Sequence, residues 1–182
     1  MLVLLLAVAF AAATPKPVDW KAMIPAVRSA LETQFPDERV EEHYPVAIAR
    51  AADIADITGD GVSEALVYLG TGGASTDQMT LMRMEDSKPV VALFRGRDGK
   101  ISSMVFLRGA SVRHGDGIDM LPNEHAVYSS HYTTDDDGKL DKCSGEAYQW
   151  NRHTKTFDYS PRLSKKLAQS SCGETGKMLL RP

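Results

Sequence analysis

Several sequence features are rare or missing, and each absence excludes some classes of protein. Neither sign of charge is in large excess: the formal net charge is −3 over 182 residues, which gives no electrostatic basis for binding nucleic acid. Beyond residue 13, no apolar run is long enough to cross a bilayer as a helix. The sequence signatures of a phosphate-binding loop, a zinc protease and a serine hydrolase are also missing.

Cysteine is scarce as well, with only Cys143 and Cys172 in the chain. An even count in an exported protein favours a disulfide, which the chain-entropy model values at roughly 3–4 kcal/mol for a loop of this length. Such a bond would tie the C-terminal segment to a strand that starts near Cys143. The alternative is two unpaired thiols, and neither cysteine has neighbours that suggest a nucleophile.

The first residues are the exception to the lack of long apolar runs. Residues 1–13 are apolar throughout and end in Ala11-Ala12-Ala13, which is typical of a secretory signal with cleavage after Ala13. No cysteine follows to accept a lipid. We therefore expect a secreted or periplasmic protein without membrane contact after cleavage. Residues 14–18 would form a Pro-containing linker.

The most informative stretch that is present runs from Asp53 to Gly70. It combines acidic side chains, a Gly-Asp-Gly turn and a following apolar strand. Calcium takes six to eight oxygen ligands, and a loop supplies them when alternate residues point inward around a sharp turn. Gly61 would permit that turn, and Asp53 could act as a further acceptor. The predicted metal ligands are Asp56, Thr58, Asp60, Val62 through its carbonyl, and Glu64.

The spacing starts like an EF-hand, but the twelfth loop position is Val67 rather than a glutamate. Residues 53–70 instead resemble one copy of the calcium loop of FG-GAP and VCBS-type repeats. The residues that carry this resemblance are Asp56, Thr58, Gly59, Asp60, Gly61, Glu64, Leu66 and Val67. In that family the loop joins two strands of a propeller blade and binds calcium, so the resemblance implies a structural calcium ion. The chain is too short for a propeller, and a metal-free turn is the alternative.

The remaining pattern predicts an α+β fold that is mainly antiparallel β. Apolar residues at helical spacing predict a helix within Asp19–Phe35, and Ser160-Pro161 predicts the start of a second, short helix that runs towards Cys172. Between them we expect about eight short strands, arranged as a meander, a sandwich or an open barrel. Residues 19–172 would form one globular domain, followed by a loose tail at 173–182.

Two further groups are candidate sites. His114 and Asp116, with the glycine-rich Gly70–Thr76 loop, would be the parts of a hydrolase if they meet in three dimensions. The Asp135–Asp141 segment partly repeats the calcium pattern, although a hairpin turn with solvated carboxylates explains it as well.

These observations favour binding over catalysis. We expect an exported, non-catalytic binding or interaction module with a structural calcium loop at Asp56–Glu64 and an unidentified protein or glycan partner. An exported hydrolase with a site near His114, Asp116 and Gly70–Thr76 is the alternative.

Overall fold

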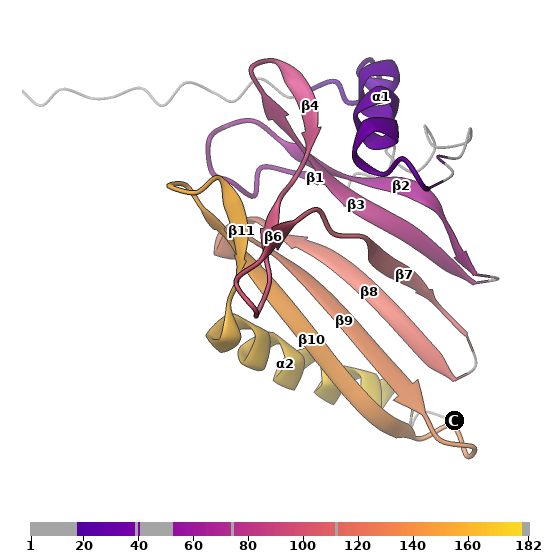
Figure 1. Cartoon of the computed structure of the whole chain (residues 1–182). Helices are drawn as coiled ribbons and strands as arrows, with labels where there is room; N and C mark the ends of the chain where they lie inside the picture. Colours follow the sequence, from indigo (N-terminus) through magenta and orange to yellow (C-terminus); the bar gives the residue numbers. More distant parts are fainter. Residues whose placement is uncertain (1–17, 39, 41–52, 74, 112, 180–182) are drawn as a thin grey trace, which may run out of the picture.

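The computed structural model describes residues 18–38, 40, 53–73, 75–111 and 113–179, which form a mainly β fold with two helices (Figure 1). The predicted signal segment and all but the last residue of the predicted linker lie outside these residues. Within the described part of the chain, no helix combines the length and the apolar character that crossing a membrane requires.

The strands of the described residues form one sheet in the order β1-β2-β3-β7-β8-β9-β10-β11-β5-β6, with β4 paired to β3. Their bounds are β1 (Ile54–Ala55), β2 (Glu64–Gly73), β3 (Thr76–Glu85), β4 (Lys88–Val91), β5 (Phe94–Arg95), β6 (Ile101–Ser102), β7 (Phe106–Ala110), β8 (His114–Leu121), β9 (Ala126–Thr134), β10 (Leu140–Asn151) and β11 (Thr156–Tyr159). A short 3₁₀ turn, Pro122–Glu124, joins β8 to β9.

The sheet curls until its hydrogen bonding closes into a ring. β3 pairs with β7 near its beginning and with β4 near its end. The segment that follows β4 then crosses to β11, since Ala92 N donates to Leu81 O (2.8 Å) and Phe157 N donates to Leu93 O (2.8 Å). The closing pair, β11 with β5, is parallel. Residues 88–95 therefore connect the two sides of the curled sheet.

The strand prediction was right in kind and wrong in detail. We expected about eight strands with mainly antiparallel pairing; the described sheet has eleven strands, and its printed pairs are antiparallel except β11 with β5, which makes it mixed. The additional strands β1, β5 and β6 are two residues long, which is too short for alternation to be visible. The parallel pair arises where the ring closes between distant segments, so no local pattern indicates it.

The main core fills the inside of the curl around Phe94. Its ring stacks on Phe157 at 5.4 Å and meets Phe106 (5.2 Å) and Tyr148 (5.5 Å) edge-on, as centroid distances. Aromatic pairs in these geometries contribute beyond their area burial. The residues that close the ring are thus also the centre of the core.

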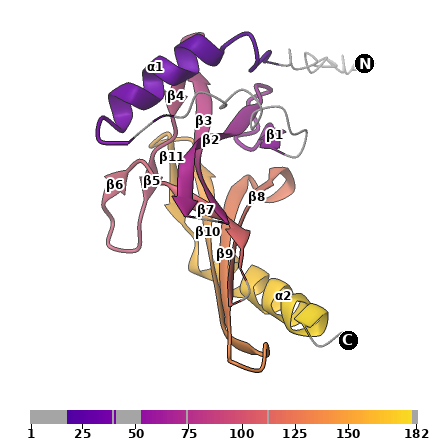
Figure 2. The ribbon, with the colours of Figure 1, turned by 90° about the vertical axis from the view of Figure 1, so that its right-hand side faces the viewer.

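Helix α1 (Ile24–Gln34) lies beside β4 at one end of the sheet (Figures 1 and 2). It buries Val27 and Leu31. It lies within the predicted Asp19–Phe35 segment, and Pro25 is accommodated in its first turn, where helical N–H groups have no intrahelical partner. Asp19 Oδ1 accepts from Ala22 N (3.1 Å) just before it.

Helix α2 (Pro161–Leu179) covers the opposite face of β9 and β10 (Figure 2). Leu163 packs there in a small cluster with Ala126, Tyr128 and Ala147. The predicted disulfide is confirmed: Cys143 on β10 is bonded to Cys172 on α2, with Cα atoms 5.7 Å apart.

The second helix is longer than the short one predicted. It continues through residues 173–179, which were predicted to belong to a loose tail. Two side-chain links hold it near this point, the disulfide at Cys172 and the bond between Tyr128 OH and Ser171 Oγ (2.7 Å).

Candidate functional site

The Asp56–Glu64 loop joins β1 to β2, which pair antiparallel with Ile54 opposite Ala65. Its turn uses two glycines with positive φ, +69° at Gly59 and +86° at Gly61. Residues with a Cβ rarely adopt this conformation. The predicted turn is therefore present, and the five predicted ligand residues are brought into one compact loop.

Asp56 and Asp60 accept hydrogen bonds from the backbone of the glycine turn. Asp56 Oδ1 accepts from Gly59 N (2.7 Å), and Asp56 Oδ2 accepts from Gly61 N (2.9 Å). Asp60 Oδ1 accepts from Val62 N (2.8 Å). These carboxylates satisfy amides that a tight turn would otherwise leave without partners.

Glu64 is directed into the protein. Its side chain is 2% exposed, and Oε2 accepts from Ile57 N (2.8 Å) and Thr58 N (3.1 Å), while Thr58 Oγ1 donates to Oε1 (3.1 Å). Burial raises the pKa of Glu64 to about 7, against the lowering effect of these three hydrogen bonds. Glu64 and Thr58 thus hold the two ends of the loop together.

The loop is also a junction between distant parts of the chain. Its backbone carbonyls accept from Trp20 Nε1 at Ser63 (3.2 Å), from His125 Nδ1 at Ile57 (3.3 Å) and from Arg152 Nη2 at Gly59 (3.1 Å). The three donors come from the segment before α1, the β8–β9 connection and the β10–β11 turn. Sequence reasoning missed all three, because nothing in their neighbourhood marks a contact made so far along the chain.

Asp53 has a different partner from the one expected. Both of its carboxylate oxygens accept from the Arg108 guanidinium, Oδ1 from Nη2 at 2.7 Å and Oδ2 from Nη1 at 3.0 Å. Arg108 Nη2 also donates to Ile118 O (3.2 Å). This buried fork anchors the start of β1 to β7 and β8, in a geometry that favours arginine over lysine.

The fit of this loop to calcium is partial. Asp56 and Asp60 keep lone pairs beyond the hydrogen bonds named above, whereas Glu64 and Thr58 are engaged with each other and with the backbone. Among the residues that the structure describes, no three Asp, Glu, His or Cys side chains are grouped to hold a metal. Asp56, Asp60 and the Val62 carbonyl are the groups through which the loop would take the ion.

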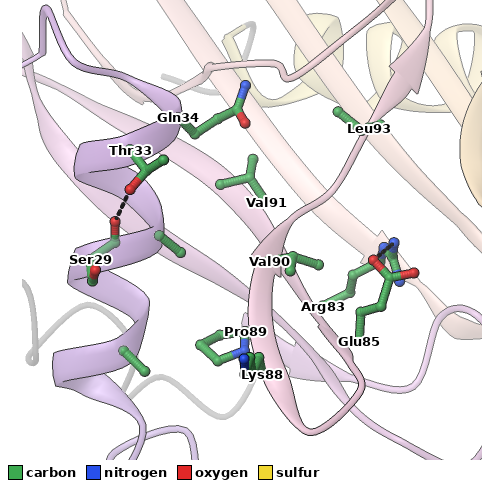
Figure 3. A pocket seen from close by; sticks show the side chains of 12 residues that line it. Ser29, Thr33, Gln34, Arg83, Glu85, Lys88, Pro89, Val90, Val91 and Leu93 are labelled. Carbon is green, nitrogen blue, oxygen red and sulfur yellow. Dashed lines mark hydrogen bonds and ion pairs between the residues drawn. The ribbon is translucent and has the colours of Figure 1, made fainter.

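A second feature is an open groove of about 620 Å³ between α1 and the β3–β4 hairpin (Figure 3). Ser29, Thr33 and Gln34 lie on its helical wall, and Arg83, Glu85 and Lys88 lie on the hairpin side. Its apolar lining consists of Ala26, Ala30, Pro89, Val90, Val91 and Leu93.

Exposed apolar side chains gather next to this groove. In the described part of the chain, the large hydrophobic side chains that are clearly exposed are Leu93 (37%), Ile101 (47%), Val105 (37%) and Leu107 (40%). All four fall in one short stretch of sequence. Leu93 lines the groove, and Gln34 Nε2 at the end of α1 donates to Ser103 Oγ (3.1 Å) beside Val105. The groove and part of this apolar stretch therefore lie close together.

The groups of the hydrolase alternative are arranged differently from the expectation. Asp116 Oδ1 accepts from His131 Nδ1 (2.8 Å), whereas His114 Nδ1 contacts Ser111 Oγ (2.8 Å). Thr76, at the end of the glycine-rich stretch, is in register with Gly109, which is in register with Asp116. The stretch thus lies two strands away from Asp116.

The Asp135–Asp141 segment forms the β9–β10 connection. Asp135 Oδ1 accepts from Asp137 N (3.0 Å) and Lys139 N (2.8 Å), and Asp135 N donates to Lys139 O (2.8 Å). These bonds are those of a hairpin turn.

The fold and site together define a mainly β protein with one curled sheet, two helices, a carboxylate-rich loop and an apolar groove. Comparison of the chain with protein-family models, with curated proteins and with solved structures finds no match.

Proposed function

We propose that this protein is an exported binding module whose contact surface is the groove between α1 and the β3–β4 hairpin. The calcium loop at Asp56–Glu64 would stabilise the fold that carries this surface. The Cys143–Cys172 disulfide supports the export part of the proposal, since disulfides persist in oxidising compartments.

One observation carries the binding role: the groove has an apolar lining and runs into exposed apolar side chains at Leu93. Exposed apolar surface of this kind costs solubility unless a partner uses it. The lining comes from a helix and a hairpin, two elements that the core of the fold already holds in place.

The chemistry of the groove favours an extended peptide segment of a partner protein. Ser29, Thr33 and Gln34 offer hydroxyl and amide groups along one wall, where they can bond to a peptide backbone. Arg83 is paired with Glu85 (3.0 Å), so the hairpin side presents both signs of charge. A lipid with one anionic head group would fit this balance less well than a peptide with apolar anchors.

The test is selection of peptides from a random library on the folded protein, followed by fluorescence-polarisation titration. We expect sequences with apolar anchors, and we expect Ala30→Arg, which places a long charged side chain in the groove, to weaken their binding tenfold or more. The control is Glu32→Arg, on an exposed position of α1 outside the groove lining. Binding that Ala30→Arg leaves unchanged would remove the groove from the proposal.

The calcium part has its own test. A metal that binds only the folded chain raises its stability by mass action, so we expect a higher melting temperature in calcium than in chelator. Asp60→Ala should abolish the difference, because it removes a ligand that stands outside the buried Glu64–Thr58 contact. An equal melting temperature in calcium and chelator, with no heat of binding by calorimetry, would reject a calcium site here.

A further inference from the structure

A second, smaller pocket adjoins the groove at Arg83 and Glu85, which line both. It has a volume of about 370 Å³ and is bounded by the Asp56–Glu64 loop, the end of β3 and the β10–β11 turn. Figure 3 shows the Arg83 and Glu85 side chains on the far side of β4 from α1. A pocket of this volume is within the range of small-molecule sites.

Arg83 has a buried donor in search of an acceptor. Its side chain is 12% exposed, and its Nε is one of two buried side-chain atoms without a hydrogen-bond partner among the described residues, the other being Ser63 Oγ. Glu85 does not satisfy it, because Oε2 accepts from Arg83 Nη2 (3.0 Å) while Oε1 accepts from Lys155 Nζ (3.0 Å). A buried donor without an acceptor is unfavourable, so a bound group that accepts from Nε is stabilising.

The pocket holds a second arginine and an aromatic ring near this donor. Arg152, on the β10–β11 turn, donates to Gly59 O through Nη2 (3.1 Å), and a guanidinium has five N–H donors in all. The Arg83 guanidinium lies 5.8 Å from the centroid of the Trp150 ring. Both arginines and Trp150 line the same cavity. Their planar guanidinium groups match the geometry of a carboxylate.

The charges around the pocket restrict the kind of ligand. The lining has three cationic side chains and three carboxylates, namely Arg83, Arg152, Lys155, Asp60, Glu85 and Asp86. A simple anion is therefore attracted by one set and repelled by the other. A molecule with a carboxylate at one end and hydrogen-bond donors at the other satisfies both sets, since ionised carboxylates only accept.

We propose that this pocket binds a small molecule that carries a carboxylate together with hydroxyl or amino groups, as sugar acids and amino acids do. The ligand carboxylate accepts from Arg83 Nε and from Arg152. The hydroxyl or amino groups donate to Asp60 and Asp86. This site takes its ligand independently of a peptide in the groove and of an ion in the Asp56–Glu64 loop.

The test is an NMR titration of the folded, disulfide-bonded chain in chelator, with the arginine Nε–H resonances followed. The probes are glucuronate and glutamate, which have the same net charge, and glucose, which has the ring without the carboxylate. We expect glucuronate or glutamate to shift the Arg83 Nε–H resonance and glucose to leave it in place. The effective probe shows whether hydroxyl or amino groups are recognised, and a resonance that neither carboxylate moves would overturn the proposal.

Calorimetry on variants ties the binding to the fork of Arg83. Arg83→Lys keeps the charge beside Glu85 and lacks the Nε–H, so it should weaken binding of the effective probe tenfold or more. Arg113→Lys is the control, at an exposed arginine outside the pocket lining, and should leave binding unchanged. Equal affinity of Arg83→Lys and the wild type would reject the assignment.

A second variant covers the case in which Arg83→Lys disturbs the fold, which near-UV circular dichroism would reveal. Arg152 is exposed, and Arg152→Gln keeps an amide that can donate to Gly59 O. It should also weaken binding tenfold or more, and unchanged affinity in this variant would remove Arg152 and the proposed carboxylate site with it.

Discussion

Glu64 is the residue whose surroundings differ most from the expectation. A carboxylate predicted to face a metal is instead buried against Ile57 N, Thr58 N and the Thr58 hydroxyl. The pattern of the loop predicted where the acidic groups gather. It did not predict that the Glu64 side chain points into the protein, because that orientation depends on how the start of β2 packs in the fold.

Glu64 makes folding stability depend on pH in the absence of calcium. Its pKa is about 7 in the folded chain against an ordinary 4.5, so the folded state holds the proton more tightly. The contribution of Glu64 to the free energy of unfolding is therefore fully present below pH 4.5. It is lost as the pH rises through about 7, and the loss is about 3 kcal/mol at most.

The comparison that isolates this effect uses Glu64→Gln, which keeps an acceptor for the backbone amides and cannot ionise. Urea unfolding of both proteins between pH 5 and pH 8, in chelator, should show a steeper loss of stability in the wild type. Parallel pH profiles would show that Glu64 titrates normally.

Gly59 is a second residue with a testable role. A Cβ at this position would lie 2.6 Å from His125 Cε1, and the backbone has φ +69°. Gly59→Ala should cost about 2–4 kcal/mol from strain and displacement of His125.

Gly138 is the matched control, because it also has positive φ (+76°) but no atom lies within 4 Å of its Cβ position. Gly138→Ala should cost only the conformational part, about 1–2 kcal/mol. Chemical denaturation of the two variants side by side measures the difference. Equal losses in the free energy of unfolding would show that the His125 side chain moves aside without cost.

At the scale of the element, α2 is held to the sheet by the disulfide and by a small apolar cluster. That cluster contains few residues, with Leu163 at its centre and Leu167 beside it. Replacing both Cys143 and Cys172 by serine should lower the free energy of unfolding by about 3–4 kcal/mol.

Hydrogen exchange should locate the change. We expect faster exchange of amides near Cys172 and little change near Ser164, whose Oγ accepts from Ala147 N (2.8 Å) and donates to Ser160 O (2.8 Å). Uniformly faster exchange along α2 would mean that the disulfide holds the whole helix.

The elements themselves show what the sequence could predict. The disulfide, the β-rich character and the two helices follow from local or compositional signals such as cysteine count, alternation and Pro-limited helical spacing. The pairs Asp53–Arg108, Asp116–His131 and Ile57–His125 do not. Each joins residues that are distant in the sequence, and which of them meet depends on strand register and packing that a single sequence does not display.

At the scale of the whole molecule, the ring of strands depends on Phe94. This side chain is fully buried and contacts three other aromatic rings, so Phe94→Ala should cost about 3–5 kcal/mol. Leu107→Ala, at a side chain that is 40% exposed, should cost less than about 1 kcal/mol. Thermal and urea unfolding measure both, and similar losses would place the centre of the core elsewhere.

The closure of the ring by residues 88–95 also bears on how the chain folds. β2 and β3 are neighbours in sequence and can pair early, whereas the hydrogen bond between Phe157 N and Leu93 O joins segments far apart in the sequence. Contacts between such distant segments raise the contact order and slow folding. If the chain is synthesised or exported from its N-terminus, the edge of residues 93–95 can pair with strands of other molecules until β11 is available. The risk of aggregation therefore lasts until almost the whole domain has been synthesised or exported.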